Sequence, residues 1–575
     1  MAKVADFLID TLVQAGVKRI WGLPGDSLNG ITESIRTNDN IEWVGVRHEE
    51  VAALAATAEA DVTGELSVCA GSCGPGNLHL INGLFEAQRS KVPMLAIAAQ
   101  IPSSELGLGY FQETHPESLY ESCSDFCKLV SHPSQLPRLL ETAMRSAILN
   151  RSVSVLVIPG DIALSESPMA KPQWSTPILP VVTPPEDKLD ELAEYLNGQK
   201  NIAFLCGYGC MGAHDEVVAL AETLQAPIVH ALRGKNAVEY DNPYDVGMTG
   251  LIGFASGYKT LKECDCLIVL GSNFPYRNFY PEHDNIIQLD IRAHHLGRRC
   301  PLKWGLVGDV KATLQALLPK LTKKDNSRFL DKSKEYYKKS REGLDDLAVP
   351  AKPGNPLHPQ HIASRISALA NDDAAFTCDV GEPTVWAARY LHLNGKRHLA
   401  GSFTHGSMAI ALPMALGIQA ADPERQVISL SGDGGLSMLM GDVITLRERN
   451  LPVKVVVFNN SLLGFVAMEM KAAGFVDDTT KFDSVNYADM ANALGVKGIR
   501  VDDASQLDEA LAEAFNHNGP VIVDVRTASQ ELSLPPRIGK EQVKGFSLYM
   551  LRAVMSGRGD ELIDLAKDNI SFLRS

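Results

Sequence analysis

Two short polar clusters late in the chain carry residue types that bind a metal ion. The motif GDGG at 432–435 follows an apolar run at 427–431, and a second apolar run at 454–458 ends in the asparagine pair 459–460. Both runs predict parallel strands buried on both faces. The carboxyl ends of such strands meet at one edge of a sheet, where ligands bind. Asp433 and Asn460 can therefore face the same point.

A carboxylate and an amide oxygen suit Mg²⁺, which takes water and phosphate oxygens at its other positions. The glycines let backbone N–H groups approach a diphosphate. The alternative is a solvated turn beside an ordinary strand end. Because the two motifs stand one βαβ unit apart, with helical spacing predicted over 436–450, we favour the metal–diphosphate interpretation.

The paired motifs resemble the signature of thiamine-diphosphate-dependent enzymes. The resemblance implies Mg²⁺ held by Asp433, Asn460 and the backbone carbonyl of Leu462. It gives Met408 the place of a bulky apolar residue that bends the cofactor, although a methionine at such a position is usually a core residue. The cofactor contacts implied are Gly406, Ser407, Met408, Asp433, Gly434, Gly435, Asn460, Ser461, Leu462, Leu463, Gly464 and Phe465.

A carboxylate near the start of the chain completes this resemblance. The segments RHEE at 47–50 and GSCGPG at 71–76 would otherwise be a helix N-terminal charge and a tight turn. The family places its glutamate after the histidine, so we assign Glu49 rather than Glu50. Glu49 would hydrogen-bond to the cofactor pyrimidine and promote proton transfer through it. For His48, His79 and His115 a structural role is at least as plausible as a catalytic one.

Four further residues match positions that line the reacting centre in pyruvate oxidases. Phe111 and Gln112 lie in the loop segment GLGYFQE, and Phe465 and Glu469 follow the asparagine pair. The alternative for the loop is a surface segment with one packed aromatic. The resemblance thus gives Glu49, Phe111, Gln112, Phe465 and Glu469 as catalytic candidates.

The central part of the chain offers a dinucleotide site. Gly207, Gly209 and Gly212 form G-x-G-x-x-G after a strand, but the next strand ends at Arg233 instead of an acid, which disfavours NAD. Similarity to flavin-containing family members implies FAD instead; a flavin-free domain is the alternative. The residues implied to touch FAD are Thr249, Gly250, Leu251, Ile252, Ser272, Asn273, Phe274, Pro275, Tyr276 and Asp290.

Alternating strands and helices predict an α/β protein with three doubly wound parallel sheets and a helical C-terminal tail. We expect a pyrimidine-binding domain at 1–182, an FAD domain at 183–334, a diphosphate- and Mg²⁺-binding domain at 335–530 and a tail at 531–575. Proline-rich and charged segments predict the linkers. The third domain is expected to repeat the architecture of the first.

The composition excludes some classes of function. The net charge of −15 and the lack of a basic block argue against nucleic-acid binding and against purely electrostatic docking on anionic membranes. The N-terminal segment is an amphipathic helix pattern with acidic residues, not a signal peptide, and no apolar run reaches about 18 residues. Ten scattered cysteines without C-x-x-C indicate reduced thiols in a cytoplasmic protein.

The tail narrows the expected activity. In its last stretch Leu562, Ile563, Ala566, Ile570 and Leu573 fall on one helical face. A docked helix is one interpretation, but the tail resembles the membrane-binding end of quinone-dependent pyruvate oxidases. That implies decarboxylation of pyruvate to acetate, electron transfer through FAD to a membrane quinone, a homotetramer, and a cytoplasmic location on the inner face of the cell membrane. A phosphate-dependent oxidase, an acetolactate synthase and a non-catalytic scaffold are the competing interpretations.

Overall fold

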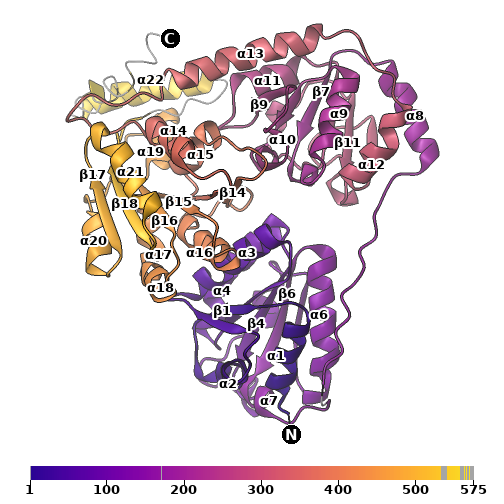
Figure 1. The fold of residues 1–575 in the computed structure, drawn as a ribbon, viewed down its shortest axis with the longest axis vertical. Coiled ribbons are helices and arrows are strands. Elements are labelled where there is room, and N and C mark those ends of the chain that lie inside the picture. The colour runs from indigo at the N-terminus through magenta and orange to yellow at the C-terminus, as the bar shows by residue number, and fades with distance from the viewer. Residues whose placement is uncertain are drawn as a thin grey trace.

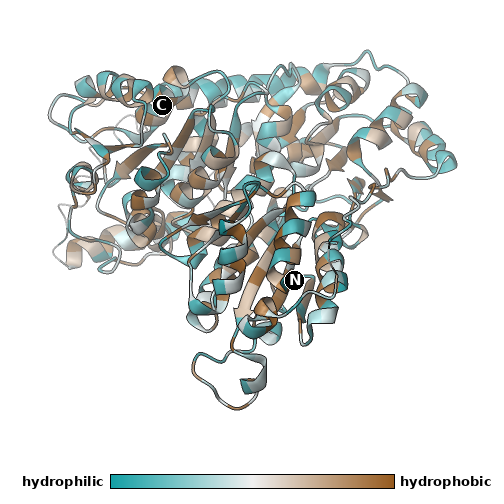
Figure 2. Ribbon diagram, turned by 60° about the horizontal axis from the view of Figure 1, so that its bottom comes forward, coloured by the Kyte–Doolittle hydropathy of each residue, from teal (hydrophilic) through white to brown (hydrophobic). Residues whose placement is uncertain are grey.

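Three six-stranded, all-parallel sheets with flanking helices make up this computed structural model (Figure 1). The structure describes residues 2–169, 171–531, 540–556 and the single positions 558, 562, 563, 565 and 569. The expected α/β class with three parallel sheets is confirmed. In Figure 2 the strands are largely hydrophobic and the outward helix faces hydrophilic, as buried parallel sheets require.

The first domain has the strand order β2-β1-β3-β4-β6-β5. Its strands are β1 (Arg19–Gly22), β2 (Glu42–Gly45), β3 (Ser67–Gly71), β4 (Met94–Gln100), β5 (Phe126–Leu129) and β6 (Val153–Pro159). Its helices are α1 (Val4–Gln14), α2 (Asn29–Arg36), α3 (Glu49–Thr63), α4 (Pro75–Ser90), α5 (Pro116–Leu119), α6 (Leu136–Asn150) and α7 (Gly160–Leu164).

The third domain has the order β14-β13-β15-β16-β18-β17, which is the order of the first domain strand for strand and confirms the expected repeat. Its strands are β13 (Ala375–Cys378), β14 (His398–Gly401), β15 (Val427–Gly432), β16 (Lys454–Asn459), β17 (Lys497–Val501) and β18 (Val521–Arg526). Its helices are α14 (Pro359–Leu369), α15 (Glu382–Tyr390), α16 (Ala411–Ala421), α17 (Asp433–Leu439), α18 (Val443–Glu448), α19 (Gly464–Ala472), α20 (Tyr487–Ala493) and α21 (Leu507–Asn516).

The middle domain has a different order, β12-β11-β10-β7-β8-β9. Read from β9, this is the 3-2-1-4-5-6 order of dinucleotide-binding sheets, with its switch point between β7 and β10. The strands are β7 (Ile202–Cys206), β8 (Ile228–His230), β9 (Asp245–Met248), β10 (Cys266–Leu270), β11 (Ile286–Asp290) and β12 (Trp304–Val307). The helices are α8 (Glu186–Asn197), α9 (His214–Leu224), α10 (Lys235–Val238), α11 (Ala255–Glu263), α12 (Val310–Leu317) and α13 (Arg328–Asp345).

The first and third domains share one hydrophobic core through α3 and α16, which lie side by side in Figure 1. The helices cross so closely that a Cβ atom on Gly417 would lie 2.0 Å from the carbonyl oxygen of Ala55. Only glycine allows this approach. The crossing fixes the third domain against the helix that begins at Glu49.

One predicted helix is wrong. Instead of a continuous helix over 436–450, the structure has α17 and α18 separated by a 3₁₀ turn at Met440–Asp442. The Asp442 carboxylate accepts a hydrogen bond from the backbone N–H of Arg47 in the first domain, at 3.0 Å. A contact between domains thus coincides with the break in the helix.

The tail helix α22 (Lys540–Met555) packs against α19. Arg552 donates a hydrogen bond to the carbonyl of Gly474 at 2.7 Å. Of the predicted apolar face, Leu562 and Ile563 are described, whereas Ala566, Ile570 and Leu573 lie outside the described residues.

Candidate active site

The GDGG turn lies at the carboxyl end of β15, where α17 begins. Asp433 is buried, and its carboxylate accepts hydrogen bonds from the N–H groups of Gly434 at 2.7 Å and Ser461 at 2.6 Å. Burial raises the pKa of Asp433 to about 6 despite these hydrogen bonds. The turn therefore holds a carboxylate that a bound cation would keep ionised.

The asparagine pair reaches the same point from β16. The Asn460 Oδ1 atom accepts a hydrogen bond from the Leu462 N–H at 3.1 Å, and Ser461 between them has a left-handed φ of 55°. A non-glycine residue is strained there, as happens at ligand sites. Since Asp433 bonds to the Ser461 N–H, the structure brings Asp433 and Asn460 together, as expected. One carboxylate, one amide oxygen and nearby carbonyls make a donor set that fits Mg²⁺.

Glu382, the first residue of α15, is a site residue that the sequence analysis missed. Its carboxylate accepts a hydrogen bond from Asn460 Nδ2 at 2.9 Å and lies against the backbone of Gly464. Burial first, then the charges of Glu531 and Asp433, raise its pKa to about 8. The only sequence signal was its position, since VGEP at 380–383 follows β13 at the same sheet edge.

Asp379 was also missed and connects the two parts of the site. It accepts hydrogen bonds from the N–H groups of Ala411 at 2.9 Å and Gly432 at 3.1 Å. Burial raises the pKa of Asp379 to about 6. The start of α16 at Ala411 is thereby fixed relative to the GDGG turn.

Apolar side chains gather over this turn. A Cβ atom on Gly434 would lie 2.6 Å from Leu463 Cδ2 and 3.7 Å from both Met408 Cε and Phe482 Cε1. Glycine is therefore required at 434, and the Met408 side chain lies over the GDGG turn. Gly406 and Ser407 precede it in the same loop.

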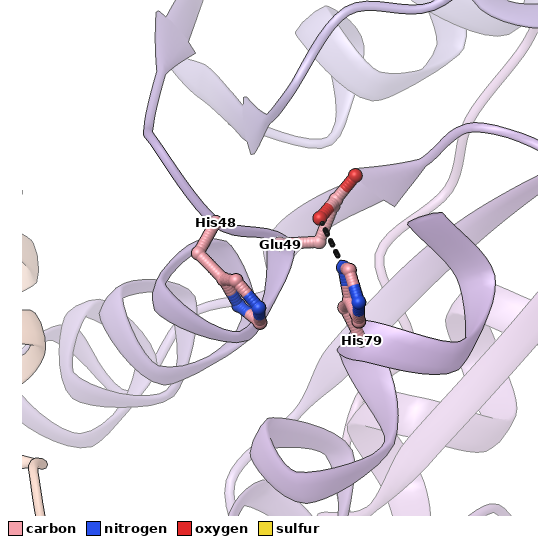
Figure 3. Close-up of side chains that lie close together, drawn as sticks. All are labelled: His48, Glu49 and His79. Atoms are coloured by element: carbon pink, nitrogen blue, oxygen red, sulfur yellow. Dashed lines mark hydrogen bonds and ion pairs between the residues drawn. The ribbon is translucent and has the colours of Figure 1, made fainter. Parts of the chain in front are cut away.

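The Glu49 group forms at the start of α3 (Figure 3). Glu49 is buried, and its Oε2 atom lies 2.9 Å from Nδ1 of His79 on α4. The His48 ring stacks on His79 with centroids 4.3 Å apart and planes 25° apart. The three side chains lie close enough to share a metal ion. However, the two histidine rings are nearly parallel, so their nitrogen lone pairs do not converge on a single point. The geometry therefore does not favour a bound metal ion.

The loop after β4 lies beside the GSCGPG turn. Gln112 has a left-handed φ of 63°, and its Oε1 atom accepts a hydrogen bond from the Cys73 thiol at 3.4 Å. Glu113 accepts the N–H groups of Gly107 at 2.5 Å and Gly109 at 2.8 Å, which orders the loop. Phe111 is 79% exposed. The structure thus places Gln112 near the Glu49 side of the first domain and presents Phe111 outward.

Glu49 is not bonded directly to the Asp433 and Asn460 pair in the single chain. Across the described part of the chain, no hydrogen bond or ion pair joins Glu49 to Asp433 or Asn460. The first domain instead reaches the third through Asn82 of α4, whose Nδ2 donates to Ser407 Oγ at 2.9 Å and to Glu50 Oε1 at 2.7 Å.

The middle-domain candidates face the third domain. Arg389 of α15 donates a hydrogen bond to the Ile252 carbonyl at 3.0 Å. Burial and, to a lesser degree, the Glu469 carboxylate of α19 raise the pKa of Tyr276. Phe465 at the start of α19 packs on the third core. Segment 249–252 therefore contacts α15, and Tyr276 of segment 272–276 lies within electrostatic reach of Glu469 on α19.

The buried polar atoms of these segments fit a bound group. Thr249 is 2% exposed, and its hydroxyl is without a hydrogen-bond partner among the described residues. Gly250 has a φ of 110° and Phe274 is buried beside it. Asp290 is already engaged, since it accepts from the Arg292 N–H at 2.8 Å and lies 3.1 Å from His295 Nδ1. Ser272, Asn273, Pro275 and Leu251 complete the two loops, and an unpaired buried hydroxyl there suits a ligand such as FAD.

Comparisons with known proteins cover most of the chain. Residues 2–119, 189–317 and 379–525 match the N-terminal TPP binding domain, the central domain and the C-terminal TPP binding domain of the thiamine pyrophosphate enzyme models. The putative thiamine pyrophosphate-containing protein YdaP of Bacillus subtilis is 37% identical over 97% of both chains.

Two relatives with named activities are more distant. Pyruvate oxidase of Lactiplantibacillus plantarum is 29% identical over 90% of this chain and 87% of its own length. The large subunit of acetolactate synthase isozyme 2 of Escherichia coli is 29% identical over 91% of this chain and 95% of its own. Identity alone does not separate these two activities.

Proposed function

This chain belongs to the thiamine pyrophosphate enzyme family, and on that premise we propose that it oxidatively decarboxylates pyruvate to acetate and CO₂ and passes the electrons through FAD to a quinone. The observation that carries the proposal is that Ile252 of the candidate flavin loop and Phe465 of α19 pack against the same hydrophobic core of the third domain. Tyr276 lies close enough to Glu469 for the carboxylate to raise the phenol pKa. A flavin held by that loop would lie beside the residues assigned to the reacting centre.

The residues of the third domain would bind the diphosphate end of the cofactor. Asp433, Asn460 and the Leu462 carbonyl would hold Mg²⁺, while Gly434 lets the diphosphate approach the backbone. Bound thiamine diphosphate supplies a carbon nucleophile and an electron sink for decarboxylation. Met408 and Leu463 would support the cofactor on its apolar side.

Glu49 would act on the opposite end of the cofactor. Its buried carboxylate can accept a hydrogen bond from a protonated pyrimidine nitrogen, as proton transfer by a positioned group requires. Since Glu49 and Asp433 are not joined within one chain, we propose that each active site pairs Glu49 of one chain with Asp433 of another. A homotetramer is the assembly that the resemblance implies. Phe111, exposed in the single chain, would then contact the second copy or the substrate.

The tail would bring the enzyme to a lipid surface. Leu551, Val554 and Met555 of α22 are 63%, 63% and 86% exposed. They stand at i, i+3 and i+4 and so form one apolar face. Among the described residues no helix is long and apolar enough to cross a membrane. An interfacial helix is therefore the form of attachment we propose, at the cytoplasmic face, where a quinone would be within reach.

Flavin reduction by pyruvate tests this function. Mixing the holoenzyme with pyruvate without oxygen should bleach the flavin, and a quinone analogue should restore it faster than O₂. Acetate should accumulate. Acetyl phosphate formed only with phosphate would indicate a phosphate-dependent oxidase instead. Acetolactate formed without flavin reduction would indicate an acetolactate synthase. That activity is the second candidate, because the chain is as similar to an acetolactate synthase as to a pyruvate oxidase.

A further inference from the structure

His79 contacts the carboxylate to which the proposed function gives the proton-transfer role. The imidazole Nδ1 atom lies 2.9 Å from Glu49 Oε2, and the His79 side chain is 45% exposed while that of Glu49 is 8% exposed (Figure 3). An ionised carboxylate can only accept, so the Nδ1 atom must carry a hydrogen and donate a hydrogen bond to it. The Oε2 atom of Glu49 is therefore held by His79, which lies on the more exposed side of the carboxylate.

The second Glu49 oxygen is confined from the other side. A Cβ atom on Gly76 would lie 3.0 Å from Glu49 Oε1, so the missing side chain at 76 leaves just enough room for that oxygen. His79 on one oxygen and the Gly76 backbone near the other leave the carboxyl group little freedom to rotate. Such confinement is what a group that acts by geometry requires.

His48 fixes the plane of the His79 ring. The His48 Nδ1 atom accepts the backbone N–H of Glu50 at 3.1 Å and so caps α3. Its ring cannot turn without losing this hydrogen bond, and His79 stacks against it. The backbone of α3 thus orients His79 through His48.

We propose that His79 is a positioning residue: its Nδ1–H fixes the Glu49 carboxylate so that Oε1 is presented to the cofactor. The inference rests on the proposed role of Glu49. It assigns no proton transfer to His79 itself. An amide nitrogen at the same place should therefore serve as well as the imidazole.

Three variants separate positioning from other roles. In His79→Asn the amide nitrogen reaches about the place of Nδ1, in His79→Gln it reaches about the place of Nε2, and His79→Leu keeps bulk without a donor. The measurement is hydrogen–deuterium exchange at the reactive carbon of bound thiamine diphosphate, quenched and read by NMR. We expect the exchange rate of His79→Asn to stay within about threefold of the wild-type rate. Gln and Leu should slow exchange about tenfold to a hundredfold, the effect of one positioned hydrogen bond.

The control variants isolate the contact. His132→Asn changes an exposed histidine of the same domain and should leave exchange unchanged. Calorimetry should give all His79 variants wild-type affinity for thiamine diphosphate with Mg²⁺, because the third domain binds the diphosphate. In the cofactor-free protein, ¹⁵N NMR should show His79 protonated at Nδ1.

Each contrary result has a definite meaning. If Leu exchanges as fast as wild type, or if Asn is as slow as Leu, His79 does not act by positioning. A neutral tautomer protonated only at Nε2 would also overturn the inference. If Glu49→Gln itself exchanges normally, the failure lies instead in the proposed role of Glu49.

Discussion

Glu86 accepts a hydrogen bond from Ser402, so a fully buried carboxyl group of the first domain holds a loop of the third. The Ser402 Oγ atom in turn accepts the N–H groups of Gly406 at 2.8 Å and Ser407 at 2.9 Å. The opposite Glu86 oxygen accepts from Ser90 Oγ at 2.6 Å. The first domain therefore supports the loop that ends at Met408.

Ser402→Ala should loosen this loop. The change removes a hydrogen-bond donor from the buried Glu86 carboxyl group, at a cost of about 1–3 kcal/mol, and removes the acceptor of the Ser407 N–H group; the Gly406 N–H keeps the Ser402 carbonyl. We expect a lower unfolding midpoint and weaker thiamine-diphosphate binding by calorimetry. Ser90→Ala is the matched control, because it removes a Glu86 partner that does not touch the loop; it should lower stability and leave affinity unchanged. Equal affinity losses in both variants would refute a specific role for Ser402.

Asp433→Ala should abolish Mg²⁺-dependent binding of thiamine diphosphate, because it removes the only charged ligand assigned to the ion. Titration calorimetry with and without Mg²⁺ measures this directly. Asp508→Asn, at an exposed acid of the same domain paired with Arg365, should bind normally. Wild-type affinity in Asp433→Ala would remove this residue from the site.

His230 of β8 should make the protein less stable in mild acid. Burial lowers its pKa to about 4 from an unfolded value of 6.5. Above pH 6.5 the His230 ring is neutral in both the folded and the unfolded state. As the pH falls toward 4, His230 becomes protonated only in the unfolded state. This lowers the free energy of unfolding by about 3 kcal/mol.

Urea unfolding between pH 4.5 and 7 tests this dependence. His230→Gln removes the titrating ring, so the difference in unfolding free energy between wild type and variant should shrink as the pH falls. Neighbouring groups such as Asp245, 3.6 Å from His230, remain in both proteins and largely cancel in the comparison. A difference that does not change with pH would contradict the assignment.

Membrane attachment should depend on the tail. Deleting 558–575, which removes Leu562 and Ile563 but keeps the apolar face of α22, should weaken liposome binding while turnover with a soluble electron acceptor is retained. Leu551→Gln with Val554→Gln should weaken binding at least about a hundredfold, since each fully buried large side chain contributes about 1.5–3 kcal/mol.

The matched control for the tail is Leu179→Gln with Val181→Gln, which changes exposed apolar residues of the first linker. It should not affect flotation with liposomes. If neither the truncation nor the Leu551→Gln, Val554→Gln variant weakens flotation, the anchor lies elsewhere. If it loses activity with every acceptor, the tail has a structural role instead.

The sequence predicted the positions of strands better than the continuity of helices or the contacts between residues far apart in the chain. The strands predicted at 427–431 and 454–458 are each one residue longer in the structure, as β15 and β16, because buried parallel strands are uninterrupted apolar runs. The helix over 436–450 was wrong, since local periodicity cannot reveal that Asp442 bonds to Arg47.

The same limit applies to the site. Asp433 and Asn460 could be paired because one βαβ unit places both at the same sheet edge. Glu382 and Asp379 follow another strand, and nothing in VGEP indicates that its carboxylate bonds to Asn460. The contact of His79 with Glu49 likewise joins two helices whose relative position no local pattern encodes.

The crossing at Gly417 and Ala55 bears on how such a chain can be recombined. Because no side chain fits at position 417, where α16 crosses Ala55 of α3, a first domain transplanted without its own third domain would meet a surface that does not match it. These two domains should therefore be inherited, or exchanged in chimeras, as a pair. The middle domain makes hydrogen bonds to both partners of this pair, such as Asn236 to the Leu399 carbonyl and Arg233 to the Ser90 carbonyl, so its exchange alone should succeed only where those contacts are kept.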